Sequence, residues 1–383
     1  MSPMKRFFYD LLKGSRSRPI GIDIGRDCVR MIQLSCVDEI IRVEGAEQEM
    51  LSAEPAPGSP GYREALVQVI GNMFSRGRFI GREVISCLPG DSLKIKSLRL
   101  DSTEAERIDE LLYGDVAQRF GLDPDKDEIR YCIAGSVYQG GEMKNEVIFF
   151  GMNRSYLGEH ISLLEEAGLD PVAVDAMPIA LFRSFQRTLR RQEDREVVSV
   201  LVNLGVQFTT VIIGKGATIA LVKQIPQGES QLTGNVAEKL GLPHAEVVQL
   251  CSKLREPGTE TADSFTRRSV MAAMSQTIEN LAREISLCFK YYAVTFRGER
   301  PSEVVFAGGN LYERALMESL QRQLNMEIHV AEPLRGFDLS RVSFDRRPNP
   351  QMCEWAVAVG LALKGWKISG LQQLESAECA VKV

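Results

Sequence analysis

A short pattern occurs twice in this chain, and the repeat limits the possible fold more than any other feature. The first copy, GIDIGRDCVRMIQL, spans residues 21–34, and the second, VNLGVQFTTVIIGK, spans residues 202–215. In each copy an apolar, β-prone run meets a glycine, Gly25 or Gly205, and a second β-prone run follows. Since glycine permits a tight turn, each copy predicts a strand, a turn and an antiparallel strand.

The two hairpins are far enough apart for each to begin a unit of domain size. Helical and strand-like segments follow each hairpin, so the chain predicts a duplicated α/β fold with two lobes. Ligands on such folds bind at the strand ends that face the cleft between the halves. We therefore expect both glycine turns to point into one shared cleft.

The composition is that of a globular protein with a large core. The chain has 383 residues, of which 44% are hydrophobic and 25% are charged, and a net charge of -5. This charge gives no general attraction to nucleic acid, so no nucleic-acid partner is expected. The eight cysteines include no CxxC pair and the three histidines are isolated, which indicates reduced core thiols and no Cys/His metal site.

Neither a membrane-spanning stretch nor a signal peptide is recognisable, so a cytoplasmic location is expected. The first residues, MSPMKRFFYDLLKGSRSRP, form a short basic amphipathic segment. Such a segment either docks on an anionic membrane surface or is a basic terminus without that role. Both interpretations stay open.

The order of elements predicts the domain organisation. A strand at SLKIKSLRL, a helix opened by the capping pattern DSTEAE and two further strands form a small α+β unit inserted in the first lobe. The expected parts are an N-terminal segment at 1–18, a first lobe at 19–90 and 151–192, the insert at 91–150, a second lobe at 193–366 and a tail at 367–383.

Basic and apolar residues are interleaved in the first strand of the insert. Solvated charges on an edge strand would explain them. Alternatively, the strand binds a peptide through main-chain hydrogen bonds, and alternate side chains pack against the first lobe. The candidate partner-binding residues are Leu93, Lys94, Ile95, Lys96, Leu98 and Arg99.

The glycine turns also suggest a chemistry. Backbone N–H groups in a tight glycine turn can bind phosphate, and a carboxylate beside them can bind Mg²⁺ through water. A third glycine element, SEVVFAGGNLYERAL, predicts a buried strand that ends at Gly308 and Gly309, with Asn310 capping a helix. Two hairpins followed by a late glycine turn resemble the actin, Hsp70 and hexokinase superfamily.

Several further segments make the resemblance more specific. They include LPGDSLKIKSLRL, LLEEAGLDPVAVDAMPIALFRSF, IPQGESQLTGNVAEKLGLPHAEVVQL, LAREISLCFKYY and WAVAVGLALKGW. In this order they resemble the PilM family of actin-like type IV pilus assembly proteins, relatives of FtsA, from about residue 3 to residue 366. The resemblance implies a duplicated actin-like (ribonuclease H-like) two-lobe α/β fold with an inserted α+β subdomain.

The resemblance also implies ATP or ADP with Mg²⁺ as the cofactor. It places a first phosphate loop around Gly25, a second around Gly205, and an adenosine turn at Gly308. The implied cofactor-binding residues are Asp23, Gly25, Arg26, Asp27, Cys28, Arg30, Asn203, Gly205, Thr209, Thr210, Gly228, Gly308, Gly309 and Asn310. Asp23 and Asn203 would be the residues nearest the metal.

Some of these positions depart from the family pattern. Asn203 stands where the family has aspartate, which removes a negative charge from the metal site and makes hydrolysis weak at most. Arg26 and Asp27 replace small hydroxyl residues, and Asp27 would repel phosphate unless a cation screens it. Gln227 stands where a second glycine is usual. We assign no catalytic residue.

The predicted function is therefore binding. By resemblance, the chain is an adaptor at the cytoplasmic face of the inner membrane that captures the cytoplasmic N-terminal segment of a PilN-like membrane protein, with self-association as a further property. The alternatives are an FtsA-like polymerising scaffold, an actin-like fold that binds no nucleotide, and a small-molecule kinase. A kinase would need a carboxylate base, for which Asp175 is the only candidate.

Overall fold

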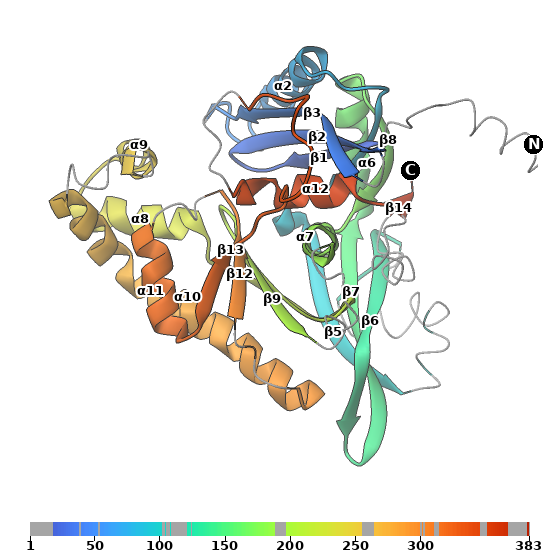
Figure 1. The fold of residues 1–383 in the computed structure, drawn as a ribbon, viewed down its shortest axis with the longest axis vertical. Coiled ribbons are helices and arrows are strands. Elements are labelled where there is room, and N and C mark those ends of the chain that lie inside the picture. Colours follow the sequence, from blue (N-terminus) through green and yellow to red (C-terminus); the bar gives the residue numbers. More distant parts are fainter. Residues whose placement is uncertain are drawn as a thin grey trace, which may run out of the picture.

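The computed structural model shows two lobes and a long inserted sheet (Figure 1). Strands of the first lobe lie above those of the second, and the inserted sheet extends along one side of the molecule. The described residues are 18–37, 40–52, 54–101, 104, 108, 121–123, 125–187, 197–254, 264–298, 301, 303–309, 314–344, 351–366 and 381–382.

The first-lobe sheet has the order β14-β8-β4-β1-β2-β3. Strand β1 pairs antiparallel with β2 and parallel with β4, so the first predicted hairpin is confirmed. The buried, β-branched character of these segments suits strands covered on both faces. Their bounds are β1 Ile20–Ile24, β2 Cys28–Val37, β3 Ile40–Met50, β4 Glu83–Cys87, β8 Asp170–Asp175 and β14 Val381–Lys382.

The second-lobe sheet repeats this topology in the order β11-β10-β9-β12-β13. Again the first strand pairs antiparallel with the second, β9 with β10, and parallel with a later strand, β12. The duplicated fold predicted from the repeat is therefore confirmed. The bounds are β9 Val198–Leu204, β10 Thr209–Lys215, β11 Thr218–Ile225, β12 Glu303–Ala307 and β13 Glu327–Val330.

Helices cover both sheets (Figure 1). In the described part of the chain, none combines the length and apolar character needed to cross a bilayer. Tyr62–Arg76 (α2), Arg154–Glu166 (α6) and Met177–Gln186 (α7) belong to the first half. The later helices are α8 Glu229–Leu240, α9 His244–Leu254, α10 Ser264–Phe296, α11 Arg314–Leu324 and α12 Ala356–Ala362, and the short 3₁₀ turns are η1 Gly90–Ser92 and η3 Cys353–Trp355.

The insert is a three-stranded sheet in the order β5-β7-β6. Its strands are β5 Leu93–Asp101, β6 Asp127–Gln139 and β7 Glu142–Asn153. The two longer strands are the two further strands predicted for the insert, and they pair antiparallel with each other. Most of the helix expected after residue 101 lies outside the described residues. Residues on one face of this sheet, such as Phe150, join a core that also contains Val174 of the first lobe and Ile212 of the second.

One feature of β5 differs from the sequence interpretation. β5 pairs with β7 over its whole length without a register shift, so successive side chains alternate between the faces throughout. Leu93 and Ile95 contact the core shared with the lobes, whereas Leu98 packs on the opposite face. Apolar and basic residues therefore exchange faces within the strand, and the expected alternation does not continue to Arg99.

The two lobes are joined where α7 and α12 cross with their backbones in contact. A Cβ atom at Gly360 in α12 would lie 1.7 Å from the Ala180 carbonyl oxygen of α7. On the other side of α12, a Cβ at Gly21 of β1 would lie 2.3 Å from the Ala358 carbonyl oxygen. Because no side chain fits at either contact, glycine sets how closely α7 and β1 approach α12.

We predict that Gly360→Ala lowers the free energy of unfolding by about 3 kcal/mol or more, since backbone atoms must move to admit the methyl group. The matched control is Gly158→Ala in α6, where a Cβ meets no atom within 4 Å. That control should be neutral or stabilising by up to about 1 kcal/mol. Urea denaturation measures both, and equal effects would contradict the prediction.

Candidate functional site

One cavity lies between the lobes, at the turns of the two hairpins. Gly25 of the first turn and Gly205 of the second both line it, together with Gly308 at the end of β12. The turns therefore face a shared space. Of the residues that the sequence analysis named, the cavity lining contains Asp23, Gly25, Arg26, Asp27, Arg30, Asn203, Gly205, Thr210, Gly308 and Gly309.

The two turns close in the same way. The Gly25 N–H donates to the Cys28 carbonyl oxygen at 2.9 Å, and the Gly205 N–H donates to the Phe208 carbonyl oxygen at 3.0 Å. A Cβ at either glycine would lie close to that same carbonyl oxygen, at 2.9 Å and 3.0 Å. The repeat in the sequence is thus a repeat in backbone geometry.

The first hairpin brings a carboxylate and a guanidinium into the cavity. Asp23 on β1 lies directly opposite Arg30 on β2. Burial raises the pKa of Asp23 from 3.8 to about 6, and the positive charge of Arg30 limits the rise. Arg30 Nε is buried and has no hydrogen-bond partner among the described residues. A buried donor of this kind is costly unless it binds something, so it fits an anion in the cavity.

The second hairpin contributes neutral polar groups. Asn203 on β9 lies opposite Thr210 on β10, and both side chains line the cavity. Thr209 immediately precedes Thr210 on β10, so its side chain points to the opposite face of the sheet. Its hydroxyl donates to the Gln227 carbonyl oxygen at 2.6 Å.

The glycine pair after β12 allows a close approach of strands. Gly308 has a φ of 127°, and a Cβ there would lie 2.3 Å from the Leu204 carbonyl oxygen. A Cβ at Gly309 would lie 3.8 Å from Arg30 Nη2, which places the first-lobe guanidinium beside the second-lobe turn. Asn310 lies outside the described residues.

Three of the named residues do not line the cavity. Cys28 is buried, and its thiol donates to the Val29 carbonyl oxygen at 3.6 Å. Thr209 has the role given above. A Cβ at Gly228 would lie 2.5 Å from the Gly205 carbonyl oxygen, so this glycine lets the start of α8 approach the second turn. The Glu229 N–H donates to that carbonyl oxygen at 3.0 Å.

Part of the cavity lining was not predicted from the sequence. The turn after β4 contributes Pro89, Gly90 and Asp91, and Glu354 comes from the 3₁₀ turn before α12. Asp91 forms an ion pair with Arg26 of the first hairpin turn. A proline, glycine and aspartate that follow a buried strand are a turn signal, but that signal does not identify a partner so far away in sequence.

The donor set fits a phosphate-bearing ligand better than a metal ion alone. Glycine turns and the Arg30 guanidinium are suitable for phosphate. In the part of the chain that the structure describes, no group of three or more His, Cys, Asp or Glu residues could hold a metal ion. Mg²⁺ commonly binds through one or two carboxylates, water and substrate phosphates. Asp23 and Asn203 fit such a shared site if phosphate is present.

Asp175, the candidate base for a kinase, lies elsewhere. It is buried, forms an ion pair with Arg183 at 2.9 Å and lies 3.6 Å from the Lys364 ammonium group. Its other oxygen accepts a hydrogen bond from the Ala176 N–H at 2.9 Å, at the start of α7. The carboxylate is not among the groups that line the cavity, so it supports the structure there.

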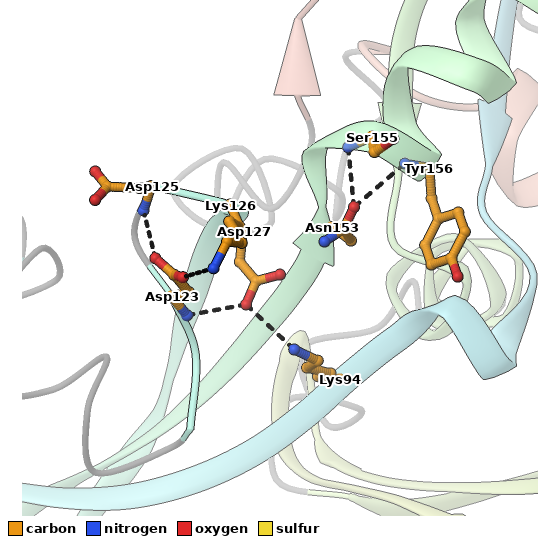
Figure 2. A network of polar contacts seen from close by, with 8 residues as sticks. All are labelled: Lys94, Asp123, Asp125, Lys126, Asp127, Asn153, Ser155 and Tyr156. Atoms are coloured by element: carbon orange, nitrogen blue, oxygen red, sulfur yellow. Dashed lines mark hydrogen bonds and ion pairs between the residues drawn. The ribbon is translucent and has the colours of Figure 1, made fainter.

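The candidate partner-binding strand β5 has one edge without a paired strand among the described residues. Figure 2 shows Lys94 beside the buried Asp127, with 3.2 Å between the ammonium group and the carboxylate. Asp127 also accepts a hydrogen bond from the Asp123 N–H at 3.0 Å. Lys96 is exposed and forms no ion pair within the described part of the chain. Lys94 is therefore engaged by Asp127 within the insert, whereas Lys96 is available to contact a partner.

Arg99, at the far end of β5, connects the insert to the second lobe. Its Nε donates to the buried Glu146 carboxylate at 2.9 Å, and its Nη2 donates to the Thr295 hydroxyl of α10 at 3.3 Å. The Tyr291 hydroxyl of α10 donates to the other oxygen of Glu146 at 2.9 Å. This network directs Arg99 toward α10.

Comparisons with known proteins agree with this architecture. A model of the family described as Type IV pilus assembly protein PilM matches residues 21–366. A solved PilM-PilN type IV pilus biogenesis complex is similar at 18% identity, covers 91% of this chain and 98% of that chain, and has a TM-score of 0.75. No curated protein is similar enough in sequence to count as a match.

A second solved structure is the ethanolamine utilization protein EutJ from Carboxydothermus hydrogenoformans. It is similar at 14% identity, covers 92% of this chain and 91% of that chain, and has a TM-score of 0.54. At these identities the two likenesses concern the fold alone. They confirm the predicted actin-like fold class.

Asp23 makes the stability of the fold depend on pH. Its pKa is about 6 in the folded chain, above the ordinary 3.8, so the folded state holds this proton more tightly and stability falls as pH rises between these values. Relative to Asp23→Asn, the free energy of unfolding of the wild type should fall by about 2 kcal/mol between pH 4 and pH 7. This value is smaller than the full pKa shift implies, because the carboxyl lines the cavity and solvent screens part of the effect.

Chemical denaturation of both proteins over this pH range measures the difference. The part of the difference that does not change with pH reflects the lost interaction with Arg30, and only the part that changes with pH tests the prediction. Parallel curves over the whole range would show that Asp23 does not titrate in this way.

Proposed function

The chain belongs to the PilM family of type IV pilus assembly proteins, and we propose that it is an adaptor that binds both a nucleotide and a membrane partner. Adenine nucleotide would bind between the lobes with Mg²⁺. The partner would be the cytoplasmic N-terminal segment of a PilN-like inner-membrane protein. In this function the protein binds and positions other components, and it turns over nucleotide weakly at most.

The single observation that carries the nucleotide proposal is the pair of glycine turns in one cavity. Their matching N–H to carbonyl closures come from different lobes, so a phosphate chain between them would contact both halves. The half-buried Arg30, with its unbonded Nε, supplies positive charge at this place. When bound, Mg²⁺ would neutralise phosphate charge, and Asp23 and Asn203 would face its water shell.

The proposal that nucleotide turnover is weak depends on the neutral side chains of the second hairpin. Hydrolysis of the phosphoanhydride bond of ATP requires a group that orients or activates water. Asn203 and Thr210 are neutral, and Asp175 is engaged with Arg183 away from the cavity. The arrangement is suited to holding a nucleotide between the lobes.

The partner proposal is based on the family and on strand β5. The similar solved structure is of a PilM-PilN complex, in which that PilM is assembled with PilN. Here β5 has an edge with no paired strand among the described residues, and Lys96 is exposed on the face away from the core shared with the lobes. An extended segment could add to this edge by main-chain hydrogen bonds. Binding to such a partner would place the protein at the inner membrane.

Self-association and direct membrane contact are further parts of the proposal. The basic segment at 1–18, on which membrane contact would depend, lies almost wholly outside the described residues. An FtsA-like polymerising scaffold is the second candidate, since it shares the fold. An actin-like fold that binds no nucleotide is the third, and the measurement below separates it from the first.

The first test is the substitution Asn203→Asp. It restores a carboxylate beside the cavity, so Mg²⁺ should strengthen ATP binding about fivefold more in this variant than in the wild type. Calorimetric titration with ATP, in Mg²⁺ and in EDTA, measures the ratio. Asn280→Asp on α10, outside the cavity lining, is the matched control and should leave the ratio unchanged.

No binding by the wild type under either condition would contradict the nucleotide proposal. Steady release of phosphate by the wild type would contradict the proposal that turnover is weak. An equal ratio in Asn203→Asp and wild type would remove Asn203 from the metal site.

The second test concerns the partner. A peptide with the sequence of the N-terminal segment of a PilN-like protein should slow amide hydrogen exchange in residues 93–101, because it would pair with the free edge of β5. Residues 40–50, the edge strand β3 of the first lobe, serve as an internal control and should be unaffected. Peptide binding without protection of 93–101 would move the partner site to another surface.

A further inference from the structure

The turn η1 (Gly90–Ser92) touches all three parts of the molecule. Asp91 forms an ion pair with Arg26, in the first hairpin turn. The Gly90 carbonyl oxygen accepts a hydrogen bond from Gln224 of the second lobe at 3.0 Å. The next residue, Leu93, begins strand β5 of the insert and is buried in the shared core. A displacement of this turn would therefore also displace the beginning of β5.

A row of paired residues connects this contact of Gln224 to the cavity. Gln224 on β11 lies opposite Thr210 on β10, and Thr210 lies opposite Asn203 on β9. These three residues form one row across the sheet. The row begins at two side chains that line the cavity and ends at the carbonyl oxygen of η1.

The Arg26–Asp91 ion pair is itself open to competition from a ligand. Both residues line the cavity, and their side chains keep 37% and 28% of their exposure. Among the described residues, the other Asp91 oxygen has only a long contact, 3.4 Å, with the Ser92 hydroxyl. Arginine binds phosphate as a bidentate partner, and partly exposed ion pairs are weak. A phosphate group in the cavity and Asp91 would therefore compete for Arg26.

We propose that the Arg26–Asp91 ion pair is a switch by which phosphate in the cavity controls η1 and the beginning of β5. Phosphate takes Arg26, and the freed Asp91 carboxylate is repelled by the like charge. The turn then moves relative to the first lobe, and Leu93 and Lys94 move with it. The inference depends on the proposed function for the identity of the anion.

Asp91 thus determines how readily the cavity accepts an anion. While it holds Arg26, it occupies a guanidinium that phosphate would use. Because coupling between two binding events is reciprocal, a peptide bound to β5 would change phosphate affinity by the factor by which phosphate changes peptide affinity. Neither Arg26 nor Asp91 needs to take part in nucleotide hydrolysis for this coupling.

The test uses the full chain with two probes, ADP and inorganic pyrophosphate, each titrated by calorimetry. Asp91→Asn frees Arg26, so it should bind pyrophosphate about tenfold more tightly than the wild type. Arg26→Gln should bind several-fold more weakly, and in the double variant the gain from Asp91→Asn should disappear. Glu83→Gln, at the other end of β4, makes the same charge change on an exposed side chain and is the matched control.

Hydrogen exchange of residues 89–101 reports the motion. In the wild type, pyrophosphate should speed exchange there; in Asp91→Asn, exchange should already be fast and should not change on binding. Tight pyrophosphate binding with equal affinity in Asp91→Asn and wild type overturns the switch. So does wild-type binding that leaves exchange in 89–101 unaltered.

The two probes separate this inference from the proposed function. If pyrophosphate and not ADP behaves as described, the switch stands and the adenine nucleotide proposal fails. If only Asp91→Asn binds either probe, phosphate does not displace Asp91 from Arg26 in the wild type and the switch fails. If neither protein binds either probe, both proposals fail.

Discussion

The meeting of the two hairpin turns at one cavity depends on the close contact of α12 with α7 and β1. Gly360 brings α12 against the α7 backbone, and Gly21 brings β1 against the other side of α12. Arg183 of α7 reinforces the crossing, because it donates to the Gly360 carbonyl oxygen at 2.8 Å and pairs with the buried Asp175. Close packing permits little adjustment at such a contact. The two sheets are therefore held in one orientation, and their hairpin turns meet at one cavity.

Much of this architecture could be predicted because its signals are local. The hairpins at Gly25 and Gly205 follow from alternating apolar residues and a glycine, and the order of strands and helices follows from the periods of successive segments. For strand β5, local signals do not predict which side chains are buried. Leu93 and Lys94 suggest an apolar face and a basic face, but Leu98 and Arg99 reverse the assignment, and only pairing with β7 fixes which face is buried.

The site was predictable to the same extent. Resemblance named the residues of each turn, but Thr209 and Thr210 are adjacent threonines and only the second lines the cavity. Which of the two threonines lines the cavity depends on which face of this hairpin meets the first lobe, and that is a long-range property. Asp91 was missed for a related reason, since its ion pair with Arg26 joins segments that are brought together only when the first sheet forms.

The polar groups of the cavity are not explained by stability. Burial opposes the ionised form of Asp23, and the buried Arg30 Nε has no partner in the described part of the chain; both features are unfavourable for folding. The fold does not require them, because the crossing of α7 and α12 and the shared core already join the lobes. A chain that used this fold only as a scaffold could have apolar residues at these positions. The guanidinium and carboxylate that face each other there are consistent with the proposed binding of a phosphate-bearing ligand between the lobes.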